Sequence, residues 1–310
     1  MTYSFPHRHL LDTDILSRTD VEAILSLAAR YALQNRSPEK KIDKFRGKTS
    51  VNLFFENSTR TRTSFEIAAK RLGMDVVNIP VAYSSTAKGE TLLDTALTLN
   101  AMQIDTLVIR HAEDGAPQSL IPHIDAHVIN AGDGKHAHPT QALLDALTIL
   151  RHKGKLDGLN VAICGDVARS RVARSNIHLL NKFGANIRVI APEYFLSPDY
   201  KEMGVELCDS LEKGIKDSDA VIMLRIQHER EGLGCSFSEK AQDYIAAYGL
   251  DHAKMKAAKP DAIVLHPGPV NRGVELTNEL ADDPHYSVIR EQVEMGVAVR
   301  MAVIDLLLSA

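Results

Sequence analysis

The 310-residue sequence has neither a long apolar run nor an excess of one charge. No stretch approaches the roughly 18 apolar residues that a membrane-spanning helix needs. The chain carries 36 Lys and Arg against 40 Asp and Glu, a net charge of −4. No global positive field therefore exists to attract nucleic acid or anionic lipid, and we expect neither a nucleic acid nor a membrane as a partner. Any anion that binds must be held by local clusters.

Cysteine pairs and a glycine-rich turn are also missing. The chain has three cysteines, Cys164, Cys208 and Cys235, which is an odd number, and no two of them form a CxxC pair. This pattern favours a reduced, cytoplasmic chain over a disulfide-linked secreted one. The apolar run 160–166 is followed by arginines instead of the GxGxxG turn that a dinucleotide needs. We expect no cofactor and no metal.

Apolar residues make up 45% of the chain, enough for two ordinary domains. Short runs rich in Val, Ile and Leu alternate with longer amphipathic runs, which is typical of parallel sheets covered by helices. We therefore expect an α/β fold with two doubly wound parallel-sheet domains joined by interdomain helices. The expected strands are residues 49–55, 75–79, 106–110, 127–130, 160–164, 186–190, 220–224 and 262–265. The expected helices include residues 61–72, 139–152, 171–183 and 287–308.

The domain boundary is expected near the polar segment 153–158. We expect a first domain at 1–137, an interdomain helix at 138–152 and a second domain at 153–286, with the final helix (about 287–310) packing back on the first domain. Ligands of such folds bind outside the carboxyl ends of the strands. The sequence therefore predicts an active site in the cleft between the two domains.

The apolar run 51–57 leads directly into the polar segment 58–63, at the start of an expected helix. Free backbone N–H groups there would bind a phosphate together with nearby side chains, namely Ser58, Thr59, Arg60 and Thr61. The alternative is that Ser58 only caps the helix, which would explain one hydroxyl but not the others.

Two further segments of the first half carry candidate groups. Arg110 ends an apolar run, where its side chain either reaches a ligand or forms a surface salt bridge. His138 directly precedes Pro139, with Gln141 one turn further on. A neutral imidazole could donate to a polarised carbonyl, or His138 could merely cap the helix. His136 and His138 alone make a poor zinc signature.

In the second half, Arg171 and Arg225 each follow an expected strand. Two planar guanidinium groups match a dicarboxylate ligand. The alternative is a network of these arginines with acidic neighbours, namely Asp166, Glu229 and Glu231. The segment 265–270 contains two prolines, and backbone carbonyls held there could accept from an amide or ammonium group, although a plain loop is equally compatible.

Seven segments together, in this order, resemble the catalytic chains of the aspartate carbamoyltransferase family. They are FFENSTRTRTSFE (54–66), SSTAKGET (84–91), the strand ending at Arg110, HAHPTQALLD (136–145), GDVARSRVARSN (165–176), MLRIQHER (223–230) and HPGPVNRGVE (266–275). The match extends from about residue 8 to residue 308. It implies carbamoyl transfer from carbamoyl phosphate to L-aspartate, the second step of pyrimidine biosynthesis, by a cytoplasmic homotrimer with shared active sites.

The resemblance also implies the role of each residue. The first domain would bind carbamoyl phosphate, which would contact Ser58, Thr59, Arg60, Thr61, Arg110, His138, Gln141 and the main-chain carbonyls of Gly268 and Pro269. The second domain would bind aspartate through Arg171, Arg225 and Gln227. Ser84 and Lys88, which composition alone assigns to an exposed loop, would reach in from the neighbouring subunit.

The resemblance leaves three alternatives open. An ornithine-accepting enzyme is disfavoured because Arg171 and Arg225 would repel a cationic side chain. A catalytically silent subunit is disfavoured because no expected polar position is lost. Family trimers work alone or join a regulatory chain or dihydroorotase, and nothing in the residues decides between these assemblies.

Overall fold

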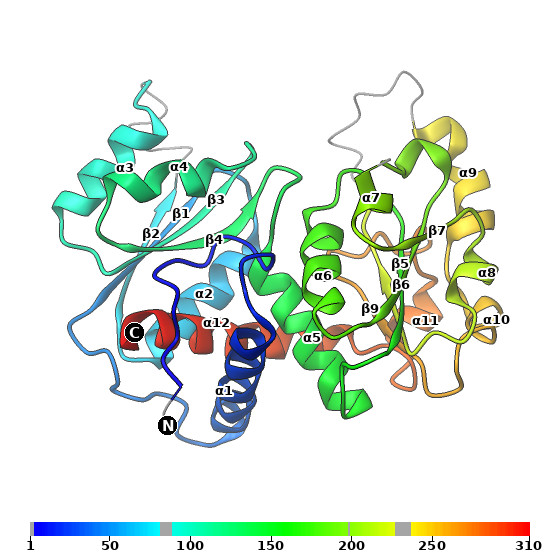
Figure 1. Ribbon diagram of the computed structural model, residues 1–310, viewed down its shortest axis with the longest axis horizontal. Coiled ribbons are helices and arrows are strands. Elements are labelled where there is room, and N and C mark those ends of the chain that lie inside the picture. Colours follow the sequence, from blue (N-terminus) through cyan, green and yellow to red (C-terminus); the bar gives the residue numbers. More distant parts are fainter. Residues whose placement is uncertain (1–2, 81–88, 198, 227–236) are drawn as a thin grey trace. The chain divides into compact units, whose positions relative to one another are not determined.

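The computed structural model describes residues 3–80, 89–197, 199–226 and 237–310. The chain forms two compact units, Met1–Leu147 with Val293–Ala310, and Thr148–Gln292. Each unit is built around one parallel sheet with helices on its faces (Figure 1). The predicted α/β fold with two parallel sheets is confirmed.

The sheet of the first unit has the strand order β2-β1-β3-β4. Its strands are β1 (Thr49–Phe54), β2 (Asp75–Pro80), β3 (Thr106–His111) and β4 (His127–Asp133), and all are parallel. The chain passes from β1 to β2 on one side and then returns to β3 on the other. The carboxyl ends of β1 and β3 therefore form a topological switch point, where open sheets of this kind bind ligands.

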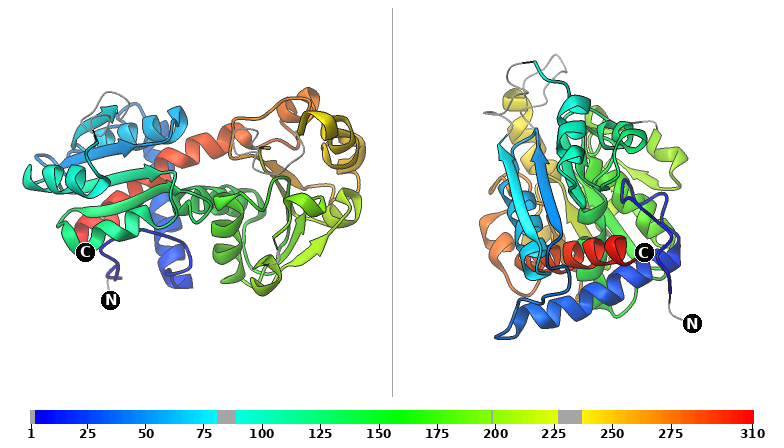
Figure 2. Two further views of the ribbon diagram at one scale, coloured as in Figure 1. Left: turned by 90° about the horizontal axis from the view of Figure 1, so that it is seen from above. Right: turned by 90° about the vertical axis from the view of Figure 1, so that its left-hand side faces the viewer.

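The helices of the first unit are α1 (Arg18–Arg36), α2 (Thr59–Arg71), α3 (Leu92–Ala101) and α4 (Ala116–Leu120), followed by a 3-10 turn (Ile121–His123). In Figure 1, α3 and α4 cover one face of the sheet and α2 covers the other. Two long helices, α5 (Pro139–Lys153) and α12 (Ile289–Ser309), contribute residues to both units. Figure 2 shows α12 crossing α1, and Tyr31 of α1 donates to Asp305 of α12.

Alternating residues of β1 and β3 build the core beneath α3. Leu53 and Ile109 are fully buried and pack in one apolar cluster with Leu99 of α3 and Leu120 of α4. Each such side chain stabilises the fold by roughly 1.5–3 kcal/mol relative to an exposed position. This packing fixes the strand ends from which the polar residues of the first unit follow.

The sheet of the second unit has the order β7-β6-β5-β8-β9 and is also parallel. Its strands are β5 (Asn160–Cys164), β6 (Asn186–Ile190), β7 (Glu206–Cys208), β8 (Ala220–Met223) and β9 (Ile263–Leu265). Its helices are α6 (Arg171–Asn181), α7 (Asp199–Glu202), α8 (Leu211–Ile215), α9 (Phe237–Tyr248), α10 (His252–Met255) and α11 (Asn278–Asp282), with a 3-10 turn at Glu193–Phe195. The order reverses between β5 and β8, so their carboxyl ends form a second switch point.

All eight expected strands are present, with ends shifted by at most three residues. Sequence reasoning missed β7, which has three residues and one exposed position, and it missed α1. The signal for α1 was available, because Ser17 and Asp20 form a capping box. Across the described residues, no helix is long and apolar enough to cross a membrane.

Candidate active site

The turn from β1 into α2 supplies the first group of candidate residues. Ser58 is the N-cap of α2, and its hydroxyl accepts from the Thr61 N–H at 3.4 Å. Thr59 and Arg60 are exposed, whereas the Thr61 side chain is buried. The first turn of α2 holds no acidic side chain that would compete for its N–H groups. Capping therefore occupies only the Ser58 hydroxyl. The remaining residues of the turn, two threonines and an arginine with no acidic side chain, are of the kind that binds an anion.

Arg110 is the second-to-last residue of β3 and pairs with Phe54 at the end of β1. Its Nε lies 3.2 Å from Glu56 Oε2, and its Nη1 donates to the Ala131 carbonyl at 3.3 Å. The pairing register of β3 with β4 shifts at this residue, which changes the direction of a side chain. Of the two predicted alternatives, the structure shows a salt bridge, formed with Glu56 at the carboxyl edge of the sheet, and the ligand contact stays a prediction.

His138 and Gln141 lie at the amino end of α5, which follows β4. The His138 carbonyl accepts from the Gln141 N–H at 3.0 Å and the Ala142 N–H at 3.3 Å, and Pro139 is the first helical residue. The main chain of His138 therefore does begin the helix. Its side chain is nevertheless buried beside Gln141, since residues three apart share one helix face.

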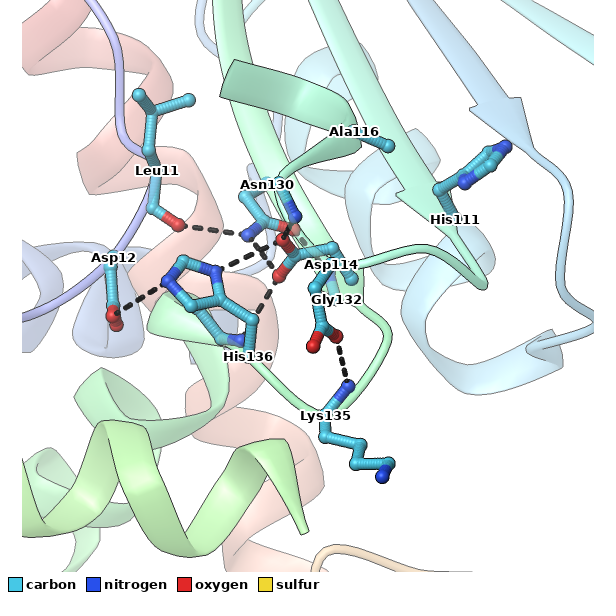
Figure 3. Close-up of polar contacts among 12 residues, drawn as sticks. Leu11, Asp12, His111, Asp114, Ala116, Asn130, Gly132, Lys135 and His136 are labelled. Atoms are coloured by element: carbon cyan, nitrogen blue, oxygen red, sulfur yellow. Dashed lines mark hydrogen bonds and ion pairs between the residues drawn. The ribbon is translucent and has the colours of Figure 1, made fainter. Parts of the chain in front are cut away.

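The loop that precedes His138 is held by Asp133, which sequence reasoning missed. Figure 3 shows this loop, with Asn130, Gly132 and His136 labelled. The buried Asp133 carboxylate accepts from Asn130 Nδ2 at 2.8 Å, from the Gly115 N–H at 2.7 Å and from the Ala137 N–H at 3.0 Å. His136 Nδ1 lies 3.0 Å from it. Burial alone would raise the pKa of Asp133, but these hydrogen bonds lower it.

The same loop requires glycine at residue 134. Gly134 has φ +40°, and a Cβ built there would lie 1.8 Å from Asp114 Oδ1. That oxygen accepts from the Lys135 N–H at 2.6 Å (Figure 3).

The hydrogen bond to Asp133 raises the pKa of His136, whose Nε2 also lies 3.9 Å from Asp12. Although carboxylates surround His136, the part of the chain that the structure describes contains no three His, Cys, Asp or Glu side chains placed to share a metal ion.

In the second unit, Arg171 and Arg225 lie at the switch point between β5 and β8. Arg171 is the first residue of α6, and Arg225 follows β8 by two residues. The two connections approach closely because residue 165 is glycine. A Cβ at Gly165, which has φ +125°, would lie 2.7 Å from the Leu224 carbonyl oxygen. The sheet thus brings the two predicted arginines to one edge.

Of the acidic neighbours predicted to form a network, Asp166 pairs with a third arginine, Arg169. Arg169 binds Asp166 with both ends of its guanidinium, at 3.0 Å from Nε and 2.7 Å from Nη2. Asp166 is completely buried, and Arg169 also lies over the Phe195 ring at 5.1 Å. This pairing orders the turn before α6.

Glu275 links the connection after β8 to the one after β9, and sequence reasoning missed it. Its carboxylate accepts from the Ile226 N–H at 2.7 Å, from the Asn271 N–H at 2.9 Å and from Asn271 Nδ2 at 2.7 Å. One donor from Ile226 and two from Asn271 thus meet on one carboxylate, which fixes the backbone directly after Arg225. The sequence offered no local signal, because Glu275 lies 49 residues from Ile226.

We expect Glu275→Gln to flatten the dependence of stability on pH. Burial raises the pKa of Glu275 to about 7, although its hydrogen bonds oppose the shift. The folded chain then keeps this proton up to about pH 7, while the unfolded chain releases it near 4.5. The free energy of unfolding of the unmutated chain should therefore fall by about 3 kcal/mol as the pH rises from about 4.5 to about 7. The Gln variant lacks this titrating group and should not show that fall. Urea unfolding at pH 5 and pH 7.5 measures the difference, and an equal pH dependence in both proteins would contradict it.

The segment after β9 contains the last two described candidates. The Gly268–Pro269 peptide bond is cis, and Gly268 has φ +66°. The Gly268 N–H donates to His266 Nδ1 at 2.8 Å, and the His266 N–H donates to Gln292 Oε1 at 2.9 Å. The segment is therefore an ordered turn.

Some of the predicted residues lie outside the described ranges. They are the candidates Ser84, Lys88 and Gln227 and the acidic neighbours Glu229 and Glu231.

Comparison with known proteins gives matches over nearly the whole chain. The family model described as aspartate/ornithine carbamoyltransferase, carbamoyl-P binding domain, matches residues 8–151. The model described as aspartate/ornithine carbamoyltransferase, Asp/Orn binding domain, matches residues 157–307. Curated relatives include the aspartate carbamoyltransferase catalytic subunits of Rhodospirillum centenum and Brucella ovis. They are 59% and 58% identical over 304 residues, which cover 98% of this chain and 95% and 94% of the relatives.

Solved structures of both branches of the family are similar to this chain. Aspartate transcarbamoylase from Trypanosoma cruzi in complex with carbamoyl phosphate and aspartate is 32% identical, with a TM-score of 0.85 and coverage of 96% of this chain and 94% of that one. Ornithine carbamoyltransferase from Pyrococcus furiosus is 28% identical, with a TM-score of 0.87 and coverage of 98% of both chains. The chain therefore belongs to the aspartate/ornithine carbamoyltransferase family.

Proposed function

We propose that the chain transfers the carbamoyl group of carbamoyl phosphate to the amine of L-aspartate, giving N-carbamoyl-L-aspartate and phosphate. The observation that carries the choice of aspartate is the pair Arg171 and Arg225 at the switch point of the second sheet. Two guanidinium groups bind two carboxylates and disfavour the cationic side chain of ornithine. The relatives with the highest identity reported above carry the aspartate enzyme's name.

Carbamoyl phosphate would be bound mainly by residues of the first unit. The phosphate would lie at the amino end of α2, where the N–H groups of the first turn and the exposed Arg60 guanidinium favour an anion. Arg110, His138 and Thr61 would donate to the carbamoyl oxygen. The amino group would donate to Gln141 and to the carbonyls of Gly268 and Pro269. Ser58 and Thr59 complete the proposed phosphate contacts, and Ser84 would join them from a neighbouring subunit.

Aspartate would be bound by the second unit through Arg171, Arg225 and Gln227, with Lys88 contributed by a neighbouring subunit. Glu275 supports this proposal indirectly, because it fixes the main chain next to Arg225. Arg169 is assigned no substrate contact, because Asp166 already binds its guanidinium at both ends.

The chemistry is a direct transfer. The aspartate amine attacks the carbamoyl carbon, a C–N bond forms, and the bond from that carbon to the phosphate oxygen breaks. Negative charge grows on the carbamoyl oxygen before the leaving group departs, and prearranged donors stabilise that charge most effectively. The departing phosphate accepts the proton that the amine loses, so the step needs no enzyme nucleophile.

The test is a colorimetric assay for ureido product on the purified chain, supplied with carbamoyl phosphate and either L-aspartate or L-ornithine. We expect product with aspartate and none above background with ornithine. Product with ornithine alone would overturn the assignment of Arg171 and Arg225, and product with neither would indicate a silent subunit or a missing partner.

We also propose that the active form is a homotrimer in the cytoplasm, with sites shared between subunits. Cys164 and Cys208, which both belong to the described residues, are free thiols, as a reducing compartment would maintain. A regulatory chain or dihydroorotase could join such a trimer, and size-exclusion chromatography of the native complex from its host distinguishes a lone trimer from a larger assembly.

A further inference from the structure

Gln141 and Asp145, one turn apart on α5, form a buried hydrogen bond. Gln141 Nε2 donates to Asp145 Oδ1 at 2.9 Å, and the two residues are 8% and 0% exposed. Gln141 is also the residue proposed to accept from the amino group of carbamoyl phosphate. The orientation of its side-chain amide therefore decides whether an oxygen or an NH₂ group is presented to the substrate.

A buried cation from α12 lies near the Asp145 carboxylate. Arg300 is 3% exposed, its guanidinium lies over the Phe65 ring at 4.9 Å, and its Nη1 donates to the Gly296 carbonyl at 3.0 Å. Burial lowers the pKa of Arg300, and the charge of Asp145 opposes this shift. Because an arginine stays protonated at neutral pH, it favours the ionised form of a nearby carboxylate.

An ionised carboxylate can only accept hydrogen bonds, which fixes the amide of Gln141. The reversed amide would place Oε1 against a carboxylate oxygen and leave two buried acceptors facing each other, which costs free energy. The nitrogen end of the amide is therefore held by Asp145, and the oxygen end is the one available to a ligand.

The position of Gln141 agrees with this role. Its N–H donates to the His138 carbonyl at 3.0 Å, and residues 138 and 141 share one face of the helix start. A planar carbamoyl group presents an oxygen acceptor on one side and an NH₂ donor on the other. His138 and Gln141 oriented by Asp145 would offer a donor and an acceptor in the matching arrangement.

We propose that Asp145 is a positioning residue that fixes the Gln141 amide with its oxygen toward the substrate, and that this makes the site select a carbamoyl phosphate over an acyl phosphate bearing a methyl group. The inference rests on the proposed function, because it assumes that carbamoyl phosphate binds at Gln141. A site built to pair with a donor discriminates against an analogue that lacks it.

The test is Asp145→Asn, which keeps the shape but can donate as well as accept, so the Gln141 amide is free to reverse. We would measure the KM for carbamoyl phosphate, and the inhibition constants of acetyl phosphate and inorganic phosphate against it. The preference for carbamoyl over acetyl phosphate should fall about tenfold, the value of one hydrogen bond. The inhibition constant of inorganic phosphate should change less than about twofold, since phosphate does not contact Gln141.

Three further variants separate positioning from loss of structure. Asp305→Asn is a matched control, because Asp305 is also buried and bound to Tyr31 and Lys44 but does not contact Gln141. It should leave the preference unchanged. Asp145→Ala removes the acceptor without adding a donor, and it serves if Asp145→Asn does not fold. In a Gln141→Ala background, Asp145→Asn should cause no further loss of preference.

An unchanged preference in both Asp145 variants would overturn the inference. So would an equal weakening of carbamoyl, acetyl and inorganic phosphate, or a full additional loss in the Gln141→Ala background. Failure of the unmutated chain to carbamoylate aspartate would instead overturn the proposed function, and the two failures are therefore distinguishable.

Discussion

Arg60→Ala is expected to lower kcat/KM for carbamoyl phosphate by about a thousandfold, with little change in stability. The variant removes a charge-assisted hydrogen bond to the phosphate and part of the charge stabilisation in the transition state, which together account for an effect of this size. Arg60 is exposed at the amino end of α2, so its removal leaves the core intact. Steady-state kinetics and the melting temperature measure both parts of the prediction.

Arg62→Ala is the matched control, because Arg62 is exposed on the same helix two residues further on. It should lower kcat/KM less than about tenfold, since screened surface charges contribute little. Equal losses in the two variants would mean that the helix carries only a diffuse positive field and no specific phosphate contact at Arg60.

Arg60→Ala also tests the shared site. Mixing it with Lys88→Ala, after subunit exchange, should restore part of the activity, because some interfaces would then combine an intact Arg60 with an intact Lys88. No recovery despite proven exchange would show that each site is built within one chain.

His138→Ala should lower kcat by about two to three powers of ten while leaving phosphate inhibition nearly unchanged. The imidazole is assigned to the carbamoyl oxygen, where removal of one oxyanion donor has an effect of this size. The initial rate at saturating substrates and the inhibition constant of inorganic phosphate provide the measurement. His136→Asn is the control, since His136 contacts Asp133 and belongs to the loop that holds His138 in place. Unchanged turnover in His138→Ala would mean that His138 has no role in the reaction.

Much of the fold was predictable because β8 and β9 are uninterrupted apolar runs and β5 is apolar after Asn160. Burial on both faces makes the composition of such strands unambiguous. The short β7 was missed because three residues, of which one is exposed, carry too little pattern. The candidate arginines were predictable for a related reason, since polar residues at strand ends stand out against the apolar runs that precede them.

The carboxylates that hold these residues in place were not predictable. Asp133 and Glu275 bind donors that converge only in the folded chain, such as the Gly115 N–H on Asp133 and the Ile226 N–H on Glu275. The pairing of Arg169 with Asp166 was likewise one of several possibilities for a cluster of arginines. Sequence patterns identify charged groups, but the choice of partner depends on loop geometry.

The central claim is that this chain joins the carbamoyl carbon directly to the aspartate nitrogen. The most direct measurement is NMR of a reaction between ¹³C-carbamoyl phosphate and ¹⁵N-L-aspartate, with phosphate release followed in the same sample. We predict an N-carbamoyl-L-aspartate that shows one-bond ¹³C–¹⁵N coupling, formed together with one equivalent of phosphate. Release of phosphate without the coupled product, or a carbamoyl group bound covalently to the protein before aspartate is added, would contradict the account.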